Sequence, residues 1–255
     1  MKITKNFIAI VLCLLLVTTS FATVSAEDSK TLKLVSKTVE VLDNGDVEVL
    51  IDIADNPGIS SISLSVSYDR NALTFKENGF VDTELMVGNL PTTLTENPFR
   101  LSWNHTSGTP ENNYKNGTVA KLYFKANAGF YGKTEISVAI VSAQTIVNKQ
   151  IARPSYEKDV VVKYYVTRDR LSIKDGEAFA YGLKGETFII ASYDHDGMID
   201  CKTYPALSGD VKIKIAEAID TDGATIVKAF LWKDLKTLAP VCNHAEEELN
   251  ITDIN

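Results

Sequence analysis

The sequence is poor in the residues that catalytic and metal sites use. It contains 3 His and 3 Cys among 255 residues. His105, His195 and His244 are scattered, without a second His or a Cys at the spacing typical of metal sites. No Gly-x-Ser-x-Gly, His-Glu-x-x-His or glycine-rich phosphate loop occurs. We therefore expect no enzyme and no resident metal or cofactor.

Positive charge is also scarce. The chain has 26 Lys and Arg against 33 Asp and Glu, a formal net charge of -7. Nucleic acids and anionic membranes favour clustered Lys and Arg, so the acidic balance disfavours both as partners. Asp and Glu are numerous, so their number alone does not exclude the pair of carboxyl groups that a glycosidase uses. However, such a pair needs a cleft, and a small β-sandwich offers little material to build one.

Long hydrophobic runs are absent beyond the N-terminus, so the mature chain has no predicted membrane span. Residues 1–26 predict a signal peptide. Lys2 and Lys5 precede the apolar run Phe7–Val17, and Val24–Ala26 forms a small-residue cleavage site. We expect a secreted, extracellular protein, either free or held at the cell surface.

The predicted mature chain keeps only two cysteines, Cys201 and Cys242. An exported protein can form disulfides, and two is the number that one bridge needs. Two separate buried thiols fit the sequence equally well. A Cys201–Cys242 disulfide is thus one of two alternatives.

Helix-forming patterns are scarce as well, and the sequence predicts an all-β protein. Runs rich in Val, Ile, Thr, Tyr and Phe alternate with turn signals such as Asn56–Gly58, Asn78–Gly79 and Asn116–Gly117. Short, regularly spaced strands are typical of a sandwich or barrel. In the first half of the chain we predict strands over 33–36, 46–54, 59–68, 99–104, 118–126, 134–143 and 160–166.

A charged joint, Thr167–Arg170, follows the last of these strands and predicts a domain boundary. The prediction is a first domain over 27–167 and a second over 168–255. The second has enough strand patterns for a small immunoglobulin-like sandwich. Its predicted strands cover 178–182, 187–193, 198–203, 211–216 and 226–232.

One predicted strand has an unusual polar face. In Ile59–Tyr68, apolar residues alternate with serines. Because side chains alternate across a strand, the apolar residues face a core and four hydroxyls face outward. Such a flat, low-entropy face is suited to docking a partner; the alternative is that serine simply keeps the strand soluble. The outward residues are Ser61, Ser63, Ser65 and Ser67.

Two other motifs have simpler interpretations. Trp103 shares its parity with Phe99 and Leu101, which predicts a core position, and we expect Trp232 in the core of the second domain. The segment Asp194–Asp200 partly matches a calcium loop. It lacks the first carboxylate and the final bidentate glutamate of that loop, so we interpret Asp-Gly there as a hairpin turn.

Four segments together give the N-terminal half a resemblance to the cohesins, the receptor modules of cellulosome scaffolds. Val47–Ile59 resembles the second strand of the family with its Asn-Pro-Gly turn, and Ser63–Asp69, followed by Leu73, resembles the third strand. Asn116–Ala126 and Gly132–Val138 resemble two later strands. The resemblance covers residues 30 to 165.

The resemblance implies a nine-stranded jelly-roll sandwich that binds dockerins, calcium-loaded modules carried by other proteins. It implies no metal on this chain itself, since the calcium belongs to the dockerin. The contact sheet of the family consists of its eighth, third, sixth and fifth strands. Many relatives place Asn or acidic residues where this chain has serines, and the fifth strand cannot be placed within 76–97. Carried over by position, the implied contacts are Ser61, Ser63, Ser65, Ser67, Arg100, Ser102, Asn104, Ser137 and Ala139.

The C-terminal part resembles a small immunoglobulin-like module of extracellular bacterial proteins. Val227–Leu235 and Leu238–Pro240 carry this likeness. It implies a spacer, a fold stabiliser, or an element that binds polysaccharide or the cell wall.

The sequence thus predicts a secreted, non-catalytic adaptor that binds a dockerin-bearing protein in a cellulosome-type, polysaccharide-degrading assembly. The alternative is a carbohydrate-binding or adhesin protein of the bacterial surface, since jelly rolls also bind glycans. A glycan binder should show aligned aromatic rings on one exposed face, and a cohesin should show a polar face. A hydrolase, the third hypothesis, should show paired carboxylates with perturbed pKa values.

Overall fold

The computed structural model describes residues 30–36, 38–41, 45–83, 85, 90–92, 96–105, 111–158 and 160–249. The predicted signal peptide, residues 1–26, lies outside this part. The described chain is nearly all β, with one short helix, α2 (Ile215–Ala218). Over the described residues, no helix has the length and apolar character needed to cross a membrane.

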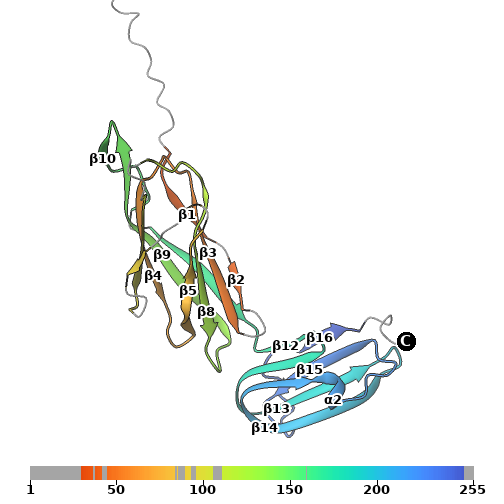
Figure 1. The fold of residues 1–255 in the computed structure, drawn as a ribbon. Coiled ribbons are helices and arrows are strands. Elements are labelled where there is room, and N and C mark those ends of the chain that lie inside the picture. Colours follow the sequence, from red (N-terminus) through yellow and green to blue (C-terminus); the bar gives the residue numbers. More distant parts are fainter. Residues whose placement is uncertain are drawn as a thin grey trace, which may run out of the picture.

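The first part of the chain forms two sheets that pack face to face (Figure 1). Its strands are β1 (Lys33–Val35), β2 (Thr38–Glu40), β3 (Asp46–Ala54), β4 (Ser61–Tyr68), β5 (Leu73–Val81), β6 (Leu90–Thr92), β7 (Phe99–Asn104), β8 (Gly117–Ala126), β9 (Gly132–Val147), β10 (Gln150–Ala152) and β11 (Val161–Arg168). One sheet has the order β1-β3-β8-β5. The other has the order β2-β11-β9-β4-β7-β6, with β10 paired to β9.

This arrangement is the predicted jelly-roll sandwich, with two short strands added to the nine expected. β1 pairs with β3 in one sheet, whereas β2, three residues later, pairs with β11 in the other. The predicted strand 33–36 corresponds to β1, and β2 is a further short strand that the sequence analysis did not predict. β10 is a three-residue return of the β9 ribbon beyond the body of the sandwich.

The alternation read from the sequence decides which side chains meet between the sheets. On β4, Ile62, Leu64 and Val66 are at most 3% exposed. Trp103 is 4% exposed, which confirms its predicted place in the core. Full burial of a side chain of this size contributes about 1.5–3 kcal/mol, so these alternating positions drive the packing of the two sheets.

The predicted turn at Asn78–Gly79 is wrong, because both residues lie within β5. Asn78 has φ 58°, and the register against β8 shifts between Phe75 and Phe80. The segment is a bulge that interrupts the alternation without ending the strand. Added at Gly79, a Cβ would lie 2.5 Å from the carbonyl oxygen of Tyr123, so the bulge leaves no room for a side chain.

The second part of the chain forms one five-stranded sheet. Its strands are β12 (Leu171–Lys174), β13 (Glu177–Tyr193), β14 (Met198–Lys214), β15 (Ile226–Trp232) and β16 (Ala245–Glu248). The order is β12-β13-β15-β16, with β14 on the other side of β13. The predicted immunoglobulin-like module is not confirmed, since that fold needs two packed sheets. The predicted strands 178–182 and 187–193 are joined in β13, and 198–203 and 211–216 are joined in β14, except that residues 215 and 216 belong to α2.

This sheet has its own apolar cluster, to which β15 contributes Val227, Ala229 and Leu231. Trp232 was predicted to share that core. It lies instead on the opposite face of β15 and is only partly buried, because adjacent residues of a strand point to opposite sides.

The alternative of a Cys201–Cys242 disulfide is wrong, since both cysteines are free. Cys201 lies on β14, opposite Ala191 of β13. Cys242 follows Val241, whose N–H donates to Leu231 on the far side of β15. β13 and β15 therefore lie between the two cysteines. Because neighbouring strands are about 4.8 Å apart, the separation of the two cysteine Cα atoms exceeds the roughly 4.4–6.8 Å that a disulfide allows. Cys201 is exposed, so the alternative of two buried thiols fails as well.

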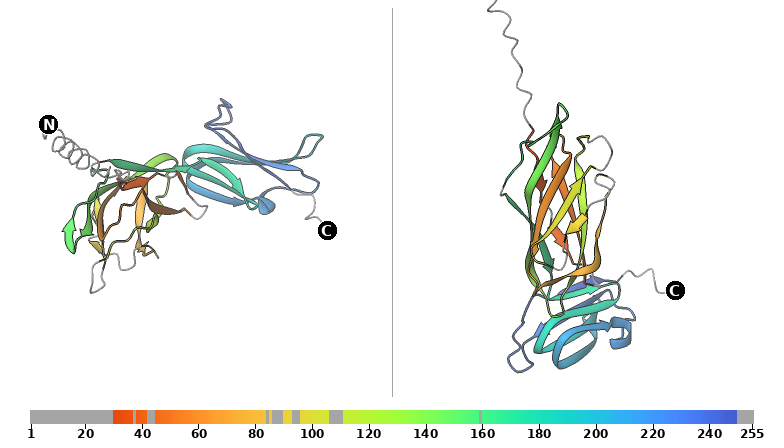
Figure 2. Two further views of the ribbon diagram at one scale, coloured as in Figure 1. Left: turned by 90° about the horizontal axis from the view of Figure 1, so that it is seen from above. Right: turned by 60° about the vertical axis from the view of Figure 1, so that its left-hand side comes forward.

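The two parts meet where β11 leads into β12 (Figures 1 and 2). The guanidinium carbon of Arg168 lies 3.4 Å from the centroid of the Tyr181 ring, and that of Arg170 lies 4.7 Å from the centroid of the Tyr131 ring. The two apolar clusters share no residue. The predicted boundary between residues 167 and 168 falls at the end of β11 and stays a prediction.

Candidate partner-binding face

The sheet order brings together the strands that the sequence assigned to a contact face. β9, β4 and β7 are direct neighbours, and β6 pairs with the outer side of β7 (Figure 2, right). We call the outward side chains of three of these strands the serine face. It consists of Ser61, Ser63, Ser65 and Ser67 of β4, Arg100, Ser102 and Asn104 of β7, and Ser137, Ala139, Ser142 and Gln144 of β9.

The strand register arranges the serine face as rows across the sheet. Ser61 lies between Asn104 and Gln144, and Ser63 lies between Ser102 and Ser142. The next row is Arg100, Ser65, Ala139 and Val161, and the fourth joins Ser67, Ser137 and Lys163. All nine contact residues that the sequence analysis named therefore share one face.

Hydrogen bonds between side chains order one end of this face. The hydroxyl of Ser61 donates to Gln144 Oε1 at 3.1 Å, and the hydroxyl of Ser102 donates to that of Ser63 at 3.2 Å. The hydroxyls of Ser65 and Ser67 have no hydrogen-bond partner among the described residues. These two hydroxyls are thus free to bond to a partner as donor or acceptor.

Two members of the face, Ser142 and Gln144, were missed from the sequence. Ser137 and Ala139 predict odd-numbered outward positions along β9. A register shift places Ile140 opposite Leu64 but Ser142 opposite Ser63, which leaves Val141 as an extra residue. The bulge moves the outward positions from odd to even numbers. A regular alternation could not have indicated this change.

The strand next to this face on the β7 side is β6, which lies within 76–97, the segment where the sequence resemblance placed no fifth strand. Leu90 pairs with Ser102 and Thr92 pairs with Arg100. At three residues, β6 is too short to show an alternation of its own. Its pairing with β7 became visible only in the folded chain.

Charges on this side of the sheet are few. Lys163 Nζ lies 2.9 Å from Glu135 Oε2, and the hydrogen bond to Glu135 raises the pKa of Lys163. Lys133 Nζ lies 3.6 Å from the ring centroid of Tyr165. Arg100 is exposed and has no ionic partner in the described part of the chain.

Aromatic side chains are nearly absent from this side. Along the described parts of β11, β9, β4 and β7, outward positions include one aromatic residue, Tyr165, which is partly buried and lies under Lys133. A sugar-stacking platform needs several exposed rings in a row. The described part of this face is therefore polar and offers no row of aromatic rings.

The carboxyl groups of the described residues show no arrangement suited to general acid catalysis. Each described carboxyl group with a perturbed pKa has that pKa lowered, whereas a glycosidase acid needs a raised one. Hydrogen bonds from lysine side chains or backbone N–H groups are the main cause in most cases. The affected groups are Asp46, Glu186, Asp194, Asp200, Asp234 and Glu246.

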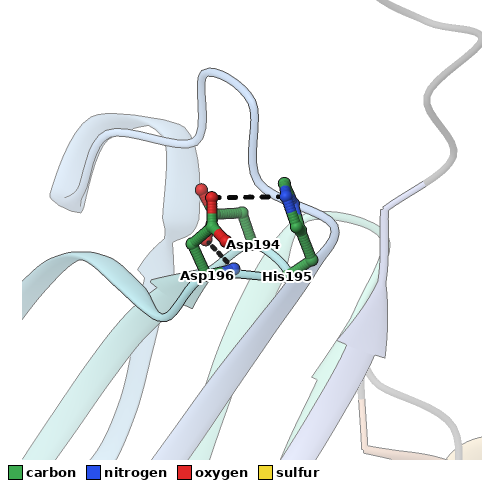
Figure 3. Close-up of side chains that lie close together, drawn as sticks. All are labelled: Asp194, His195 and Asp196. Carbon is green, nitrogen blue, oxygen red and sulfur yellow. Dashed lines mark hydrogen bonds and ion pairs between the residues drawn. The ribbon is translucent and has the colours of Figure 1, made fainter.

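The calcium-loop-like segment is a hairpin turn, as predicted. Asp194 Oδ1 accepts a hydrogen bond from the N–H of Asp196 at 2.8 Å (Figure 3) and another from the N–H of Gly197 at 2.8 Å. The N–H of Asp194 donates to the carbonyl of Gly197. His195 Nε2 lies 3.2 Å from Asp196 Oδ2 on the exposed side of the turn. The Asp194 carboxylate thus closes the turn between β13 and β14.

No protein-family model matches this sequence, and no curated protein matches it. Similar folds occur among solved structures. The seventh ScaB type I cohesin from Pseudobacteroides cellulosolvens shares 16% identity, with a TM-score of 0.46 over 54% of this chain and 93% of the other. CaCohA2 from Clostridium acetobutylicum shares 17% identity, with a TM-score of 0.44 over 55% of this chain and 92% of the other. The Coh-OlpA–Doc918 complex is a type I cohesin–dockerin complex from Clostridium thermocellum. Its matching chain shares 15% identity, with a TM-score of 0.43 over 54% of this chain and 99% of the other.

Proposed function

We propose that this protein is a secreted, non-catalytic adaptor whose serine face binds a dockerin module carried by a partner protein. The setting is the assembly of a polysaccharide-degrading, cellulosome-type complex. The main support is the order β9-β4-β7-β6 in one sheet. This is the order of the eighth, third, sixth and fifth strands, the contact strands that the cohesin resemblance implies.

The physical properties of the serine face suit a docking role. Its side chains stand on a hydrogen-bonded sheet, so little conformational entropy is lost when a partner covers them. Serine and alanine allow a partner backbone to approach closely. The free hydroxyls of Ser65 and Ser67 then offer donors and acceptors at the point of closest approach.

Calcium enters this proposal through the partner. The Asp194 turn uses its carboxylate on backbone N–H groups, and the serine face has no carboxylate of its own. The dockerin is expected to need bound calcium to keep its fold. A chelator should therefore abolish binding by unfolding the partner module while leaving this chain intact.

The glycan-binding alternative receives less support from this face. Stacking against sugar rings needs exposed aromatic side chains, and Tyr165 is the one aromatic residue among the described outward positions of β11, β9, β4 and β7. It lies at the β11 side, beneath Lys133. A polar, hydroxyl-rich surface favours recognition of a protein.

Capture of purified calcium-loaded dockerin modules, with and without EDTA, tests the proposal. We expect binding that EDTA removes and that the double variant Ser65→Arg, Ser67→Arg abolishes. Ser208→Arg places the same bulk and charge on exposed β14 and should bind like the wild type. Circular dichroism checks that each variant is folded. The proposal would be refuted if neither EDTA nor the double substitution weakened binding. It would also be refuted if the protein captured polysaccharide alone.

A further inference from the structure

We propose that the partner presents a carboxylate to Arg100, and that this one residue selects among partners by charge. The inference rests on the proposed function, because it concerns the occupant of the serine face. It goes further by naming the chemistry of that occupant. The observation that carries it is an exposed arginine that has no ionic partner among the described residues, on a face whose other side chains are neutral.

Arg100 occupies a row of small, neutral neighbours. It lies on β7 between Ser65 of β4 and Thr92 of β6, and Ala139 follows Ser65 in the same row. No side chain of the serine face carries a negative charge. Arg100 is exposed, and the described residues provide no ionic partner for it. Within the described part of the chain, no side chain pairs with its guanidinium, which is exposed to water when the face is uncovered.

The charge of the serine face is opposite in sign to that of the whole protein. The chain has a formal net charge of -7. Arg100 is the one charged side chain among the residues that define the serine face, and the neighbouring Lys163 and Glu135 neutralise each other. An acidic protein with a cationic docking face is complementary to a partner with an acidic contact surface.

The charge of Arg100 affects binding affinity most strongly when a partner covers the face. A partner that docks on Ser65 and Ala139 removes water from the neighbouring guanidinium, and an unpaired buried charge is costly. The planar fork of an arginine fits both oxygens of one carboxylate. A partner with Lys or Arg at that point meets a like charge, which weakens binding and provides selectivity.

The test uses the full chain on a surface and purified, calcium-loaded dockerin modules in solution. The module that the wild type binds most tightly is then titrated against Arg100→Gln, Arg100→Glu and a control, Lys236→Glu. Lys236 is exposed on the loop after β15, so its reversal changes the net charge equally without touching the face. Binding is measured at low and high NaCl.

We expect Arg100→Glu to weaken binding by about tenfold or more, and Arg100→Gln by less. Lys236→Glu should stay within about twofold of the wild type, as is usual for distant surface changes. Salt should weaken the wild type more than Arg100→Gln. Exchange of the contacting Asp or Glu of the module for Lys should restore binding to Arg100→Glu.

Two failures are distinguishable. If the wild type binds a module and Arg100→Glu binds it equally well, the charge inference is overturned and the adaptor function stands. If the wild type binds none of the modules, the adaptor function fails and the inference falls with it. Wild-type affinity that does not change with salt would also count against the carboxylate.

Discussion

The carboxylate of Asp210 accepts a hydrogen bond from the backbone N–H of Gly129, with both of its oxygens 3.0 Å from that nitrogen. Asp210 lies on β14 of the five-stranded sheet, and Gly129 lies in the turn between β8 and β9 of the sandwich. The same carboxylate accepts the N–H of Gly182 at 2.9 Å. One side chain thus ties the sandwich turn to β13, next to the pairs that Arg168 and Arg170 form.

This junction depends on the absence of a side chain at Gly182. Its φ is +62°, and an added Cβ would lie 2.7 Å from both the Gly129 carbonyl oxygen and Tyr131 Cε1. We predict that Gly182→Ala lowers the free energy of unfolding by about 2 kcal/mol or more, through left-handed strain together with a clash. Urea denaturation measures the change.

Gly209→Ala is the matched control, because Gly209 has φ +83° with no atom within 4 Å of its added Cβ. It should cost only the backbone strain, about 1 kcal/mol. Equal losses for the two variants would show that the close approach of Gly182 to Gly129 does not contribute to stability.

The ion pair of Arg170 with Glu186 predicts a loss of stability in acid. Arg170 Nη2 lies 2.6 Å from Glu186 Oε1, and both side chains are at most 15% exposed. Burial alone would raise the pKa of Glu186, but hydrogen bonds from the Lys184 N–H and from Arg170 lower it below 4.5. A carboxyl group with a lowered folded pKa stabilises the fold above its unfolded pKa, and protonation removes that contribution.

We therefore expect the contribution of Glu186 to be complete at neutral pH and to disappear as the pH falls below about 4.5 through the lower folded value. Denaturation curves for the wild type and Glu186→Gln should differ at pH 7 and approach each other as the pH falls below 4.5. A constant difference across that range would contradict the assignment.

Asn56 is a structural residue at the start of the Asn56–Gly58 turn, which precedes β4. It is 2% exposed, and its side-chain amide donates to the carbonyls of Asn113 and Lys115 at 2.9 Å each. Its Oδ1 accepts the N–H of Gly58. Asn56→Ala should cost about 2–4 kcal/mol, because three backbone groups lose their partner.

Thermal or urea unfolding measures the loss in Asn56→Ala, with Asn243→Ala as the control. Asn243 is exposed and lies in the loop before β16. Its replacement should change the free energy of unfolding by less than about 0.5 kcal/mol. If both variants unfold like the wild type, the hydrogen bonds of Asn56 are replaced by water at no cost.

The two free thiols should react at different rates. Cys201 is exposed on β14, whereas Cys242 is partly buried and burial raises its pKa. Because the thiolate is the reactive form, Ellman's reagent should modify Cys201 first and Cys242 slowly in the folded protein. Two thiols should be counted after denaturation without a reductant. Finding none under those conditions would show a disulfide.

Much of the fold followed from local patterns that tertiary packing preserved. β3, β7 and β15 begin and end where the alternation of apolar residues predicted. The nine named contact residues lie on one face because parity holds along β4, β7 and the first part of β9. These segments were predictable because each strand buries one side only.

Three of the errors share one physical origin, the local break of a regular repeat. Asn78 bulges within β5, Val141 bulges within β9, and register shifts beyond Gly182 keep β13 continuous. A bulge shows the same Gly and Asn signals as a turn. Hydrogen bonds to the neighbouring strand decide between the two, and those neighbours are distant in sequence.

By itself the sequence determined the strand content, the burial of Trp103 and the outward serines of β4, since these depend on the two-residue period of a strand. Only the tertiary structure decided which strands lie beside that serine strand. It placed β6 on β7, moved Ser142 and Gln144 onto the face, and kept the two cysteines apart. Pairing partners are chosen by packing between segments that are far apart in the chain. The serines were visible in the sequence, but the face that they share with Arg100 exists only in the folded sheet.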